Sequence, residues 1–375
     1  MSGLPRPAGA APASGRPRAM IERGMGCEPL LRKRRTGPGR LATVALAVAS
    51  ALLSAATSAL PRAWVGIDGV DAGSCARATP CRTLTYAITQ VDAGGEVNVL
   101  DSGGYGEVLI DKAVTVHAAP GIVAGIVATG GPAITVNAGT NDRVALHGLT
   151  ISSSATRSGI VVNSVGLVHI ENCVLNGPGS ADGDPFGIRM AAPAPAKALI
   201  SDTLIRNYLH GVVATNAELD RVRSLGNLGD GVRVVTGGRV VVARSTLSGN
   251  QASGAYGYST TNGATTVLVV EDTLLTRNGV GAFGYTSETG GTTRLTLSNN
   301  TIADNVTGVW GYSNSDSTVE LTLSGNMIAA NSTGVVVAMN STIGVAVTVA
   351  RTRQNNTIAF NGSDVVGTLT PLSPM

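Results

Sequence analysis

The sequence predicts an all-β solenoid, in which short parallel strands coil around one apolar core. A degenerate repeat runs from near Val144 to the C-terminus, and each copy has an apolar strand, a small polar residue, an aliphatic residue and a Gly-aliphatic pair. Successive copies lie about 20 to 30 residues apart, a period typical of units that bury their apolar faces only by stacking. The composition, with 49 Gly, 3% aromatic and 14% charged residues, favours strands and turns over helices.

One aliphatic residue marks each copy of the repeat and is expected to point into the core. These anchors are Ile151, Leu175, Ile205, Leu225, Leu247, Leu275, Ile302, Ile328 and Ile358. Two-residue hairpin turns are largely absent between the apolar runs, which argues against an antiparallel meander. The equivalent residues recur in the same order and direction, so the coils should stack like on like, about 4.8 Å apart.

Asparagines recur three residues after five of the anchors. They are Asn250, Asn278, Asn305, Asn331 and Asn361. Stacked amides can bond coil to coil and satisfy backbone groups in the turns. The sequence therefore predicts a structural Asn ladder at one turn of the solenoid, rather than catalytic or glycosylated residues.

The N-terminal region has the order of segments seen in exported proteins. Residues 1–40 are rich in Pro, Gly, Ala and Arg and are expected to form a disordered basic leader. Residues 41–59 are apolar and end in small residues, which predicts the hydrophobic region of a signal peptide, with Met20 or Met25 as possible true starts. An uncleaved membrane anchor is the competing interpretation. Without the leader, the net charge changes from +3 to about −4, so the basic balance of the full chain gives no support for nucleic-acid binding.

Residues 60–95 are predicted to form an N-terminal cap. Cys75 and Cys81 enclose a short loop, and this spacing favours a local disulfide, with free thiols as the alternative. Residues 83–91 place Leu84, Ala87 and Ile88 on one helical face, which predicts a capping helix. The β-helix itself is expected over residues 96–366, and residues 367–375 are expected to form a Pro-rich tail that does not extend it.

The segment from Ala63 to Val116, which contains the Cys-x5-Cys loop, the short helix and the run GGEVNVLDSGGYG, is followed by NDRVALHGLTI. Together they resemble the N-terminal region of bacterial secreted right-handed parallel β-helix repeat proteins with the pectin-lyase-like fold. The resemblance implies a single-stranded right-handed parallel β-helix and export, and it implies no established reaction. Members of the group carry further cysteines in the first strands, where this chain has Val99 and His117, so one cross-link is missing.

Candidate catalytic residues are sparse. His147, Glu171 and Arg221 each lie four residues before an anchor, with His169 nearby, and could align as an acid/base patch on one outer face. Asp202 lies three residues before its anchor, but the ladder it would belong to has gaps, so neither a metal site nor a cofactor is predicted. A solvated strand face is the other interpretation of these polar residues.

Aromatic residues give the more distinctive pattern. Three consecutive copies contain GAYGY, GAFGY and GVWGY, which align Tyr256, Phe283 and Trp310 in one column and Tyr258, Tyr285 and Tyr312 in another. We call these six residues the aromatic stripe. Arg189 and Arg233 occupy the first column in earlier copies, where burial of a charge would be costly, so both columns should face solvent.

Exposed rings of this kind can bind the apolar faces of sugars. The leading hypothesis is therefore a non-catalytic, polysaccharide-binding module that is secreted, periplasmic or on the cell surface. It has no membrane span in the mature form and no nucleic-acid partner. Two alternatives are a polysaccharide lyase, hydrolase or epimerase of the same fold, and a structural or adhesive module whose stripe contacts another protein or is covered by a loop.

Overall fold

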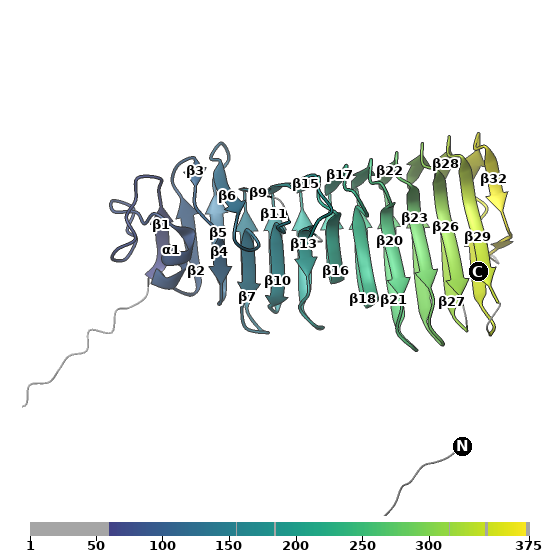
Figure 1. The fold of residues 1–375 in the computed structure, drawn as a ribbon, viewed down its shortest axis with the longest axis horizontal. Helices are drawn as coiled ribbons and strands as arrows, with labels where there is room; N and C mark the ends of the chain where they lie inside the picture. The colour runs from purple at the N-terminus through teal and green to yellow at the C-terminus, as the bar shows by residue number, and fades with distance from the viewer. Residues whose placement is uncertain (1–59, 155, 184, 315, 342–343, 373–375) are drawn as a thin grey trace, which may run out of the picture. The chain divides into compact units, whose positions relative to one another are not determined.

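The structure, a computed structural model, describes residues 60–154, 156–183, 185–314, 316–341 and 344–372. In this part the chain winds as a parallel β-helix, and the coils follow one another along the axis in sequence order (Figure 1). The predicted all-β solenoid is confirmed. The predicted leader and signal segment, residues 1–59, lie outside the described residues.

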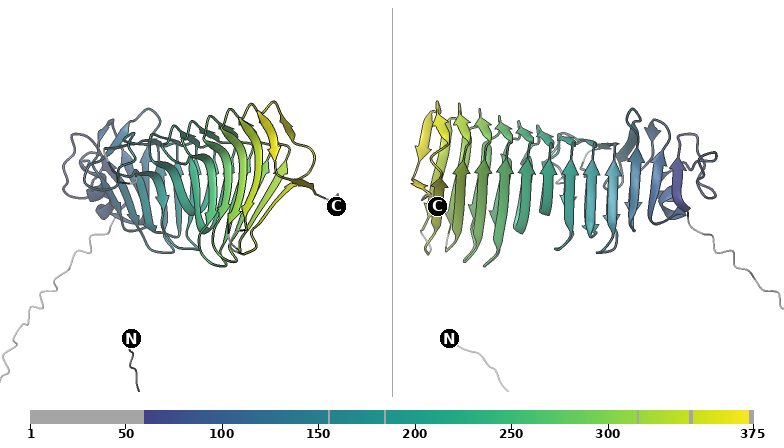
Figure 2. Two further views of the ribbon diagram at one scale, coloured as in Figure 1. Left: turned by 45° about the vertical axis from the view of Figure 1, so that its right-hand side comes forward. Right: turned by 180° about the vertical axis from the view of Figure 1, so that it is seen from behind.

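Each coil contributes strands to three faces, numbered here in chain order (Figure 2). Face 1 holds β1 (Leu60–Val65), β2 (Val91–Val99), β5 (Val114–Ala118), β8 (Arg143–His147), β11 (Leu167–Glu171), β14 (Lys197–Ser201), the C-terminal parts of β16 (His210–Asp220) and β18 (Val232–Ala243), β21 (Thr265–Glu271), β24 (Thr292–Ser298), β27 (Thr318–Ser324), β30 (Val347–Thr352) and β33 (Leu369–Pro371). Face 2 holds β3 (Gly103–Gly104), β6 (Ala124–Ala128), β9 (Leu149–Ser153), β12 (Val174–Asn176), β15 (Leu204–Arg206), β17 (Arg223–Leu225), β19 (Thr246–Ser248), β22 (Leu274–Thr276), β25 (Thr301–Ala303), β28 (Met327–Ala329) and β31 (Thr357–Ala359). Face 3 holds β4 (Val108–Ile110), β7 (Ile134–Asn137), β10 (Ile160–Ser164), β13 (Phe186–Met190), the N-terminal parts of β16 and β18, β20 (Ser253–Ser259), β23 (Val280–Thr286), β26 (Thr307–Asn314), β29 (Thr333–Asn340) and β32 (Ser363–Val366).

The core forms because side chains alternate between inside and outside along each strand. In β5 and β9 every second residue is buried, as a strand with one face in the core requires. Most of the predicted anchors are fully buried: Ile151, Leu175, Ile205, Leu247, Leu275, Ile302 and Ile328. Each such side chain contributes about 1.5 to 3 kcal/mol by leaving water, and stacked coils share the resulting core.

One anchor prediction is wrong by a single residue. In β17 the register pairs Ser224, not Leu225, with Ile205 below and Leu247 above. Ser224 is fully buried, and its hydroxyl donates to the carbonyl of Gly231 at 2.8 Å. The apolar pattern predicts Leu225 as the core residue. A serine can take the core position here because its hydroxyl is hydrogen-bonded, and hydrophobicity does not reveal this.

The Asn ladder is present in the turn after face 2. The Nδ2 of each asparagine donates to the Oδ1 of the next over 2.8 to 3.0 Å, and the same oxygen accepts the backbone N–H below it. Asn227 is an additional member at the start, missed because its anchor was misplaced. A second ladder, of Asn300, Asn326 and Asn356, lies in the turn before face 2.

The N-terminal end carries the predicted helix and cross-link. Helix α1 (Leu84–Gln90) begins after Thr83, whose side chain accepts from the backbone N–H of Tyr86, and it buries Leu84, Ala87 and Ile88. A disulfide joins Cys75 and Cys81. Strand β1 already pairs in parallel with β2, so face 1 begins before the helix.

The C-terminal end differs from the expectation. Residues 367–375 were expected to lie outside the solenoid, but β33 pairs in parallel with β30 within this segment. Pro371, the proline that argued against a strand, is the last residue of β33. Because β33 is the last strand of face 1, the missing N–H of Pro371 does not interrupt the hydrogen bonds between inner strands. Among the described residues, no helix has the length and hydropathy needed to cross a bilayer.

Candidate functional site

The turn from face 1 to face 2 places polar residues outside the coils. Its corner residue adopts a left-handed backbone conformation, with φ between +48° and +56° at Asn172, Asp202, Arg221, Arg244, Asp272 and Asn299. The backbone N–H of each of these residues donates to the coil above, as Asp202 does to the carbonyl of Asp220 at 3.1 Å. Asp202 and Arg221 are thus corner residues of consecutive turns. The repeat pattern in the sequence does not reveal this equivalence.

Asp202 and Arg221 form a two-pronged ion pair. The Nε of Arg221 lies 2.7 Å from Oδ1 of Asp202, and its Nη2 lies 2.6 Å from Oδ2. Arg221 also pairs with Asp220, which in turn pairs with Arg244 at 2.6 Å. The hydrogen bonds from Arg221 lower the pKa of Asp202 below its usual range. A carboxylate held in this way is a weak proton acceptor.

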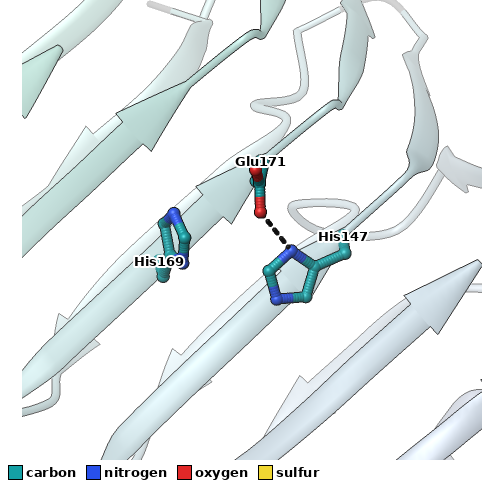
Figure 3. A group of neighbouring side chains, drawn as sticks. All are labelled: His147, His169 and Glu171. Atoms are coloured by element: carbon teal, nitrogen blue, oxygen red, sulfur yellow. Dashed lines mark ion pairs between the residues drawn. The ribbon is translucent and has the colours of Figure 1, made fainter. Parts of the chain in front are cut away.

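His147 and Glu171 form a separate pair on face 1. They lie directly opposite each other on β8 and β11, with 3.0 Å between Nδ1 of His147 and Oε2 of Glu171 (Figure 3). Burial lowers the pKa of His147, while the charge of Glu171 opposes that shift. His169, two residues before Glu171 on β11, packs edge-on with its ring centroid 5.3 Å from that of His147.

A cavity of about 730 Å³ opens beside this pair. His147 and Glu171 form part of its wall, together with Glu96, Thr115, His117, Asn172 and the loop of residues 118–122. His117 is the strand neighbour of His147 on β5, and their ring centroids are 6.3 Å apart. Three of the four histidines of the chain therefore lie on neighbouring coils.

The structure does not align Arg221 with His147 and Glu171, so that part of the predicted patch is wrong. The column continues from Glu171 to Ser201 and then to Asp220. The error has the same cause as the misplaced anchor at Leu225, since counting back from Ser224 reaches Asp220. The histidine cluster of His117, His147 and His169 has one signal in the sequence, which is the recurrence of His117 and His147 just before successive turns.

The aromatic stripe lies on face 3. Strands β20, β23 and β26 place Tyr256, Phe283 and Trp310 in one column and Tyr258, Tyr285 and Tyr312 in the other. All six side chains are half-buried, whereas the alternating Ala255, Ala282 and Val309 are fully buried in the core. Five of the rings line an open cavity of about 470 Å³, and no other described residue contributes to its wall.

The rings of the aromatic stripe stack on one another along the axis. The centroids of Tyr256 and Phe283 are 5.1 Å apart, and those of Phe283 and Trp310 are 4.8 Å apart, with planes inclined by 16° and 24°. Both faces of Phe283 are thus covered by neighbouring rings. The expectation that the stripe offers flat ring faces to a ligand is therefore wrong for Phe283, and this column presents ring edges and the hydroxyl of Tyr256 instead.

A basic segment adjoins the stripe on the same face. Arg233 is the strand neighbour of Tyr256, and its guanidinium lies 5.4 Å from the centre of that ring and 5.9 Å from that of Tyr258. Asp230, which is almost fully buried, holds Nε of Arg233 at 2.7 Å. Both Arg189 and Arg233 line a cavity of about 370 Å³ that ends at Tyr258. From the sequence, these arginines indicate only that the stripe faces solvent.

Residues 132–292 match the family model described as "Right handed beta helix region". The A-module of the mannuronan C-5 epimerase AlgE4 of Azotobacter vinelandii is similar over 78% of this chain and 93% of that chain, with 14% identity and a TM-score of 0.50. The AlgE6 A-module of the same organism (75% and 92%, 14% identity) and the GH136 lacto-N-biosidase of Eubacterium ramulus (80% and 68%, 11% identity) both have TM-scores of 0.45. The comparison with curated proteins found no match.

These comparisons concern the fold. The family match and the AlgE4 module agree with the sequence in assigning a right-handed parallel β-helix. Identities this low leave the chemistry of the chain to its own residues.

Proposed function

This chain is a right-handed parallel β-helix, and we propose that it is a secreted module that binds an acidic polysaccharide along face 3. The observation that carries the proposal is the aromatic stripe, which lines an open cavity and continues into a segment with two arginines. The Cys75–Cys81 disulfide supports export, because such cross-links persist in oxidising compartments.

The aromatic rings of the stripe contact the polysaccharide through the ring edges. The hydroxyls of Tyr256, Tyr258, Tyr285 and Tyr312 make no hydrogen bond to another described residue, so they are available to sugar hydroxyls. Ring edges between the two columns supply apolar contact. The stacked columns are already ordered in the free protein, which reduces the conformational entropy lost on binding.

The arginines select an acidic chain. Arg233 is held in place by Asp230 and the rings of Tyr256 and Tyr258, and Arg189 has no carboxylate partner among the described residues. Guanidinium groups bind carboxylates through two parallel hydrogen bonds, which suits uronate or other acidic sugars. A repeating polymer suits a surface whose rows recur from coil to coil.

We expect saturable binding of acidic polysaccharides, measured by calorimetric titration with mannuronan, polygalacturonate and a neutral glucan. Replacing Tyr285 and Tyr312 together by Phe should weaken binding about tenfold, because two hydrogen bonds are lost while the stack remains. Arg189→Gln should weaken binding of the acidic polymers only. Binding should also fall as salt is raised.

Trp310→Phe is the matched control. The Nε1 of Trp310 is buried without an acceptor among the described residues, so Phe keeps the stack and removes an unsatisfied donor. We expect unchanged folding and loss of any Trp fluorescence response on binding, since Trp64 is the only other Trp. Equal affinity of the neutral and acidic polymers, or no effect of the Tyr variants, would contradict the proposal.

A second candidate is a polysaccharide-active enzyme of this fold. The His147–Glu171 pair beside the cavity of about 730 Å³ favours it, because a paired imidazole and carboxylate can move a proton. Product release in the same titrations, lost in Glu171→Gln, would support the enzyme. Binding without products would support the module.

A further inference from the structure

The histidine cluster on face 1 has the donors of a metal site. His147, His169 and Glu171 each offer one ligand atom, and these three atoms lie within 4.8 Å of one another. We propose that His147, His169 and Glu171 bind a divalent transition-metal ion that prefers imidazole ligands, such as Zn²⁺. The site is independent of the aromatic stripe, which lies on face 3.

The backbone already places these donors close to the required geometry. A tetrahedral site with bond lengths of about 2.0 to 2.1 Å sets its ligand atoms roughly 3.3 Å apart. Nδ1 of His147 and Oε2 of Glu171 are separated by 3.0 Å. A cation can therefore lie between these two atoms without a shift of either strand.

His169 supplies the third ligand from the same strand as Glu171. The two residues are separated by one position on β11, so both side chains point outward (Figure 3). The ring of His169 packs at 88° to that of His147, and a rotation about its side-chain bonds brings one nitrogen toward the pair. All three residues are half-buried, which limits competition from water.

The donor set selects the class of metal. Two imidazoles and one carboxylate suit Zn²⁺ and its neighbours, whereas Ca²⁺ prefers six to eight oxygen ligands. Three protein ligands leave at least one position of a tetrahedral ion open. His147 and Glu171 also line the cavity of about 730 Å³, so that position has room for water or a ligand.

The test is a calorimetric titration of the full chain with Zn²⁺ alone and, separately, with Ca²⁺ alone. We expect one Zn²⁺ site of micromolar or tighter affinity and no comparable Ca²⁺ binding. His169→Gln and Glu171→Gln should each weaken the site at least a hundredfold. Visible absorption of the Co²⁺-loaded protein gives a second readout, which should change from the aquo-ion spectrum only when all three residues are present.

His117→Gln is the matched control, because His117 lies in the same column and lines the same cavity but is outside the trio. It should retain Zn²⁺ affinity within about threefold. Circular dichroism without metal establishes that each variant is folded. Absence of Zn²⁺ binding, binding unaffected by His169→Gln and Glu171→Gln, or an equal loss in His117→Gln would each overturn the proposal.

Discussion

At the residue scale, position on the coil decides what a polar side chain can do. Asp202 and Arg221 occupy turn corners and neutralise each other, whereas His147 and Glu171 end neighbouring strands beside a cavity. Both pairs bring polar side-chain atoms into close contact. The second pair lines the cavity of about 730 Å³, so we assign the candidate chemistry to that pair.

Glu107 shows how one carboxylate can clamp two coils. Its Oε1 accepts from the backbone N–H groups of Thr129, Gly130 and Gly131 at 2.6, 2.6 and 3.1 Å. These hydrogen bonds lower the pKa of Glu107 to about 2. Because the folded pKa lies below the unfolded one, the clamp stabilises the fold above about pH 4.5 and is lost as the pH falls through about 2.

We therefore expect Glu107→Gln to lower the unfolding midpoint at neutral pH and to have progressively less effect below about pH 4.5. The contribution is modest because the carboxylate is exposed to solvent. Urea titrations of both proteins at pH 7, 5 and 3 measure the difference. A difference that grows on acidification would show that the clamp does not depend on the charge of Glu107.

At the element scale, residues at equivalent positions stack because parallel strands repeat in register. The same rule produces the Asn ladders inside the turns and the aromatic stripe outside face 3. The asparagine amides point inward and form hydrogen bonds with buried backbone groups. The aromatic rings point outward, and their tyrosine hydroxyls are available to a partner. We accordingly expect the ladder to contribute to stability, and the stripe is the surface that we propose for binding.

Asn305→Ala should destabilise the protein by about 2 to 4 kcal/mol. Asn305 is almost fully buried, and its amide bonds to the carbonyl of Leu275 and to Oδ1 of Asn331, so truncation leaves several buried groups unpaired. Asn163→Ala removes an exposed Asn–Asn hydrogen bond and should change the free energy of unfolding by no more than about 0.5 kcal/mol. Equal effects in urea unfolding would rule out the structural role of the ladder.

At the scale of the whole molecule, a solenoid keeps its sites apart. The histidine cluster lies on β8 and β11 of face 1, and the aromatic stripe lies on β20, β23 and β26 of face 3. Each coil contacts mainly its neighbours, so stability is nearly a sum of coils and interfaces. Changes at one site should leave the other intact, which makes the two proposals separately testable.

Coils at the C-terminal end should open more often than central ones. All four residues of β32 are exposed, with Val366 at 47%, whereas β23 is flanked by coils on both sides. We expect amide hydrogen exchange in β32 to be at least tenfold faster than in β23, measured by mass spectrometry. Comparable protection would indicate that another surface covers the last coil.

The sequence by itself determined the class of fold, the capping helix, the Asn ladder and the alignment of the aromatic stripe. These features follow from local spacing, because parallel coils turn a repeat along the chain into a column in space. Only the tertiary structure decided that Ser224 replaces Leu225 in the core, that the column of Tyr256, Phe283 and Trp310 is stacked ring on ring, and that three histidines gather near Glu171. Each of these depends on the exact register between coils, which varies wherever a turn gains or loses a residue and hydrophobicity alone does not reveal it.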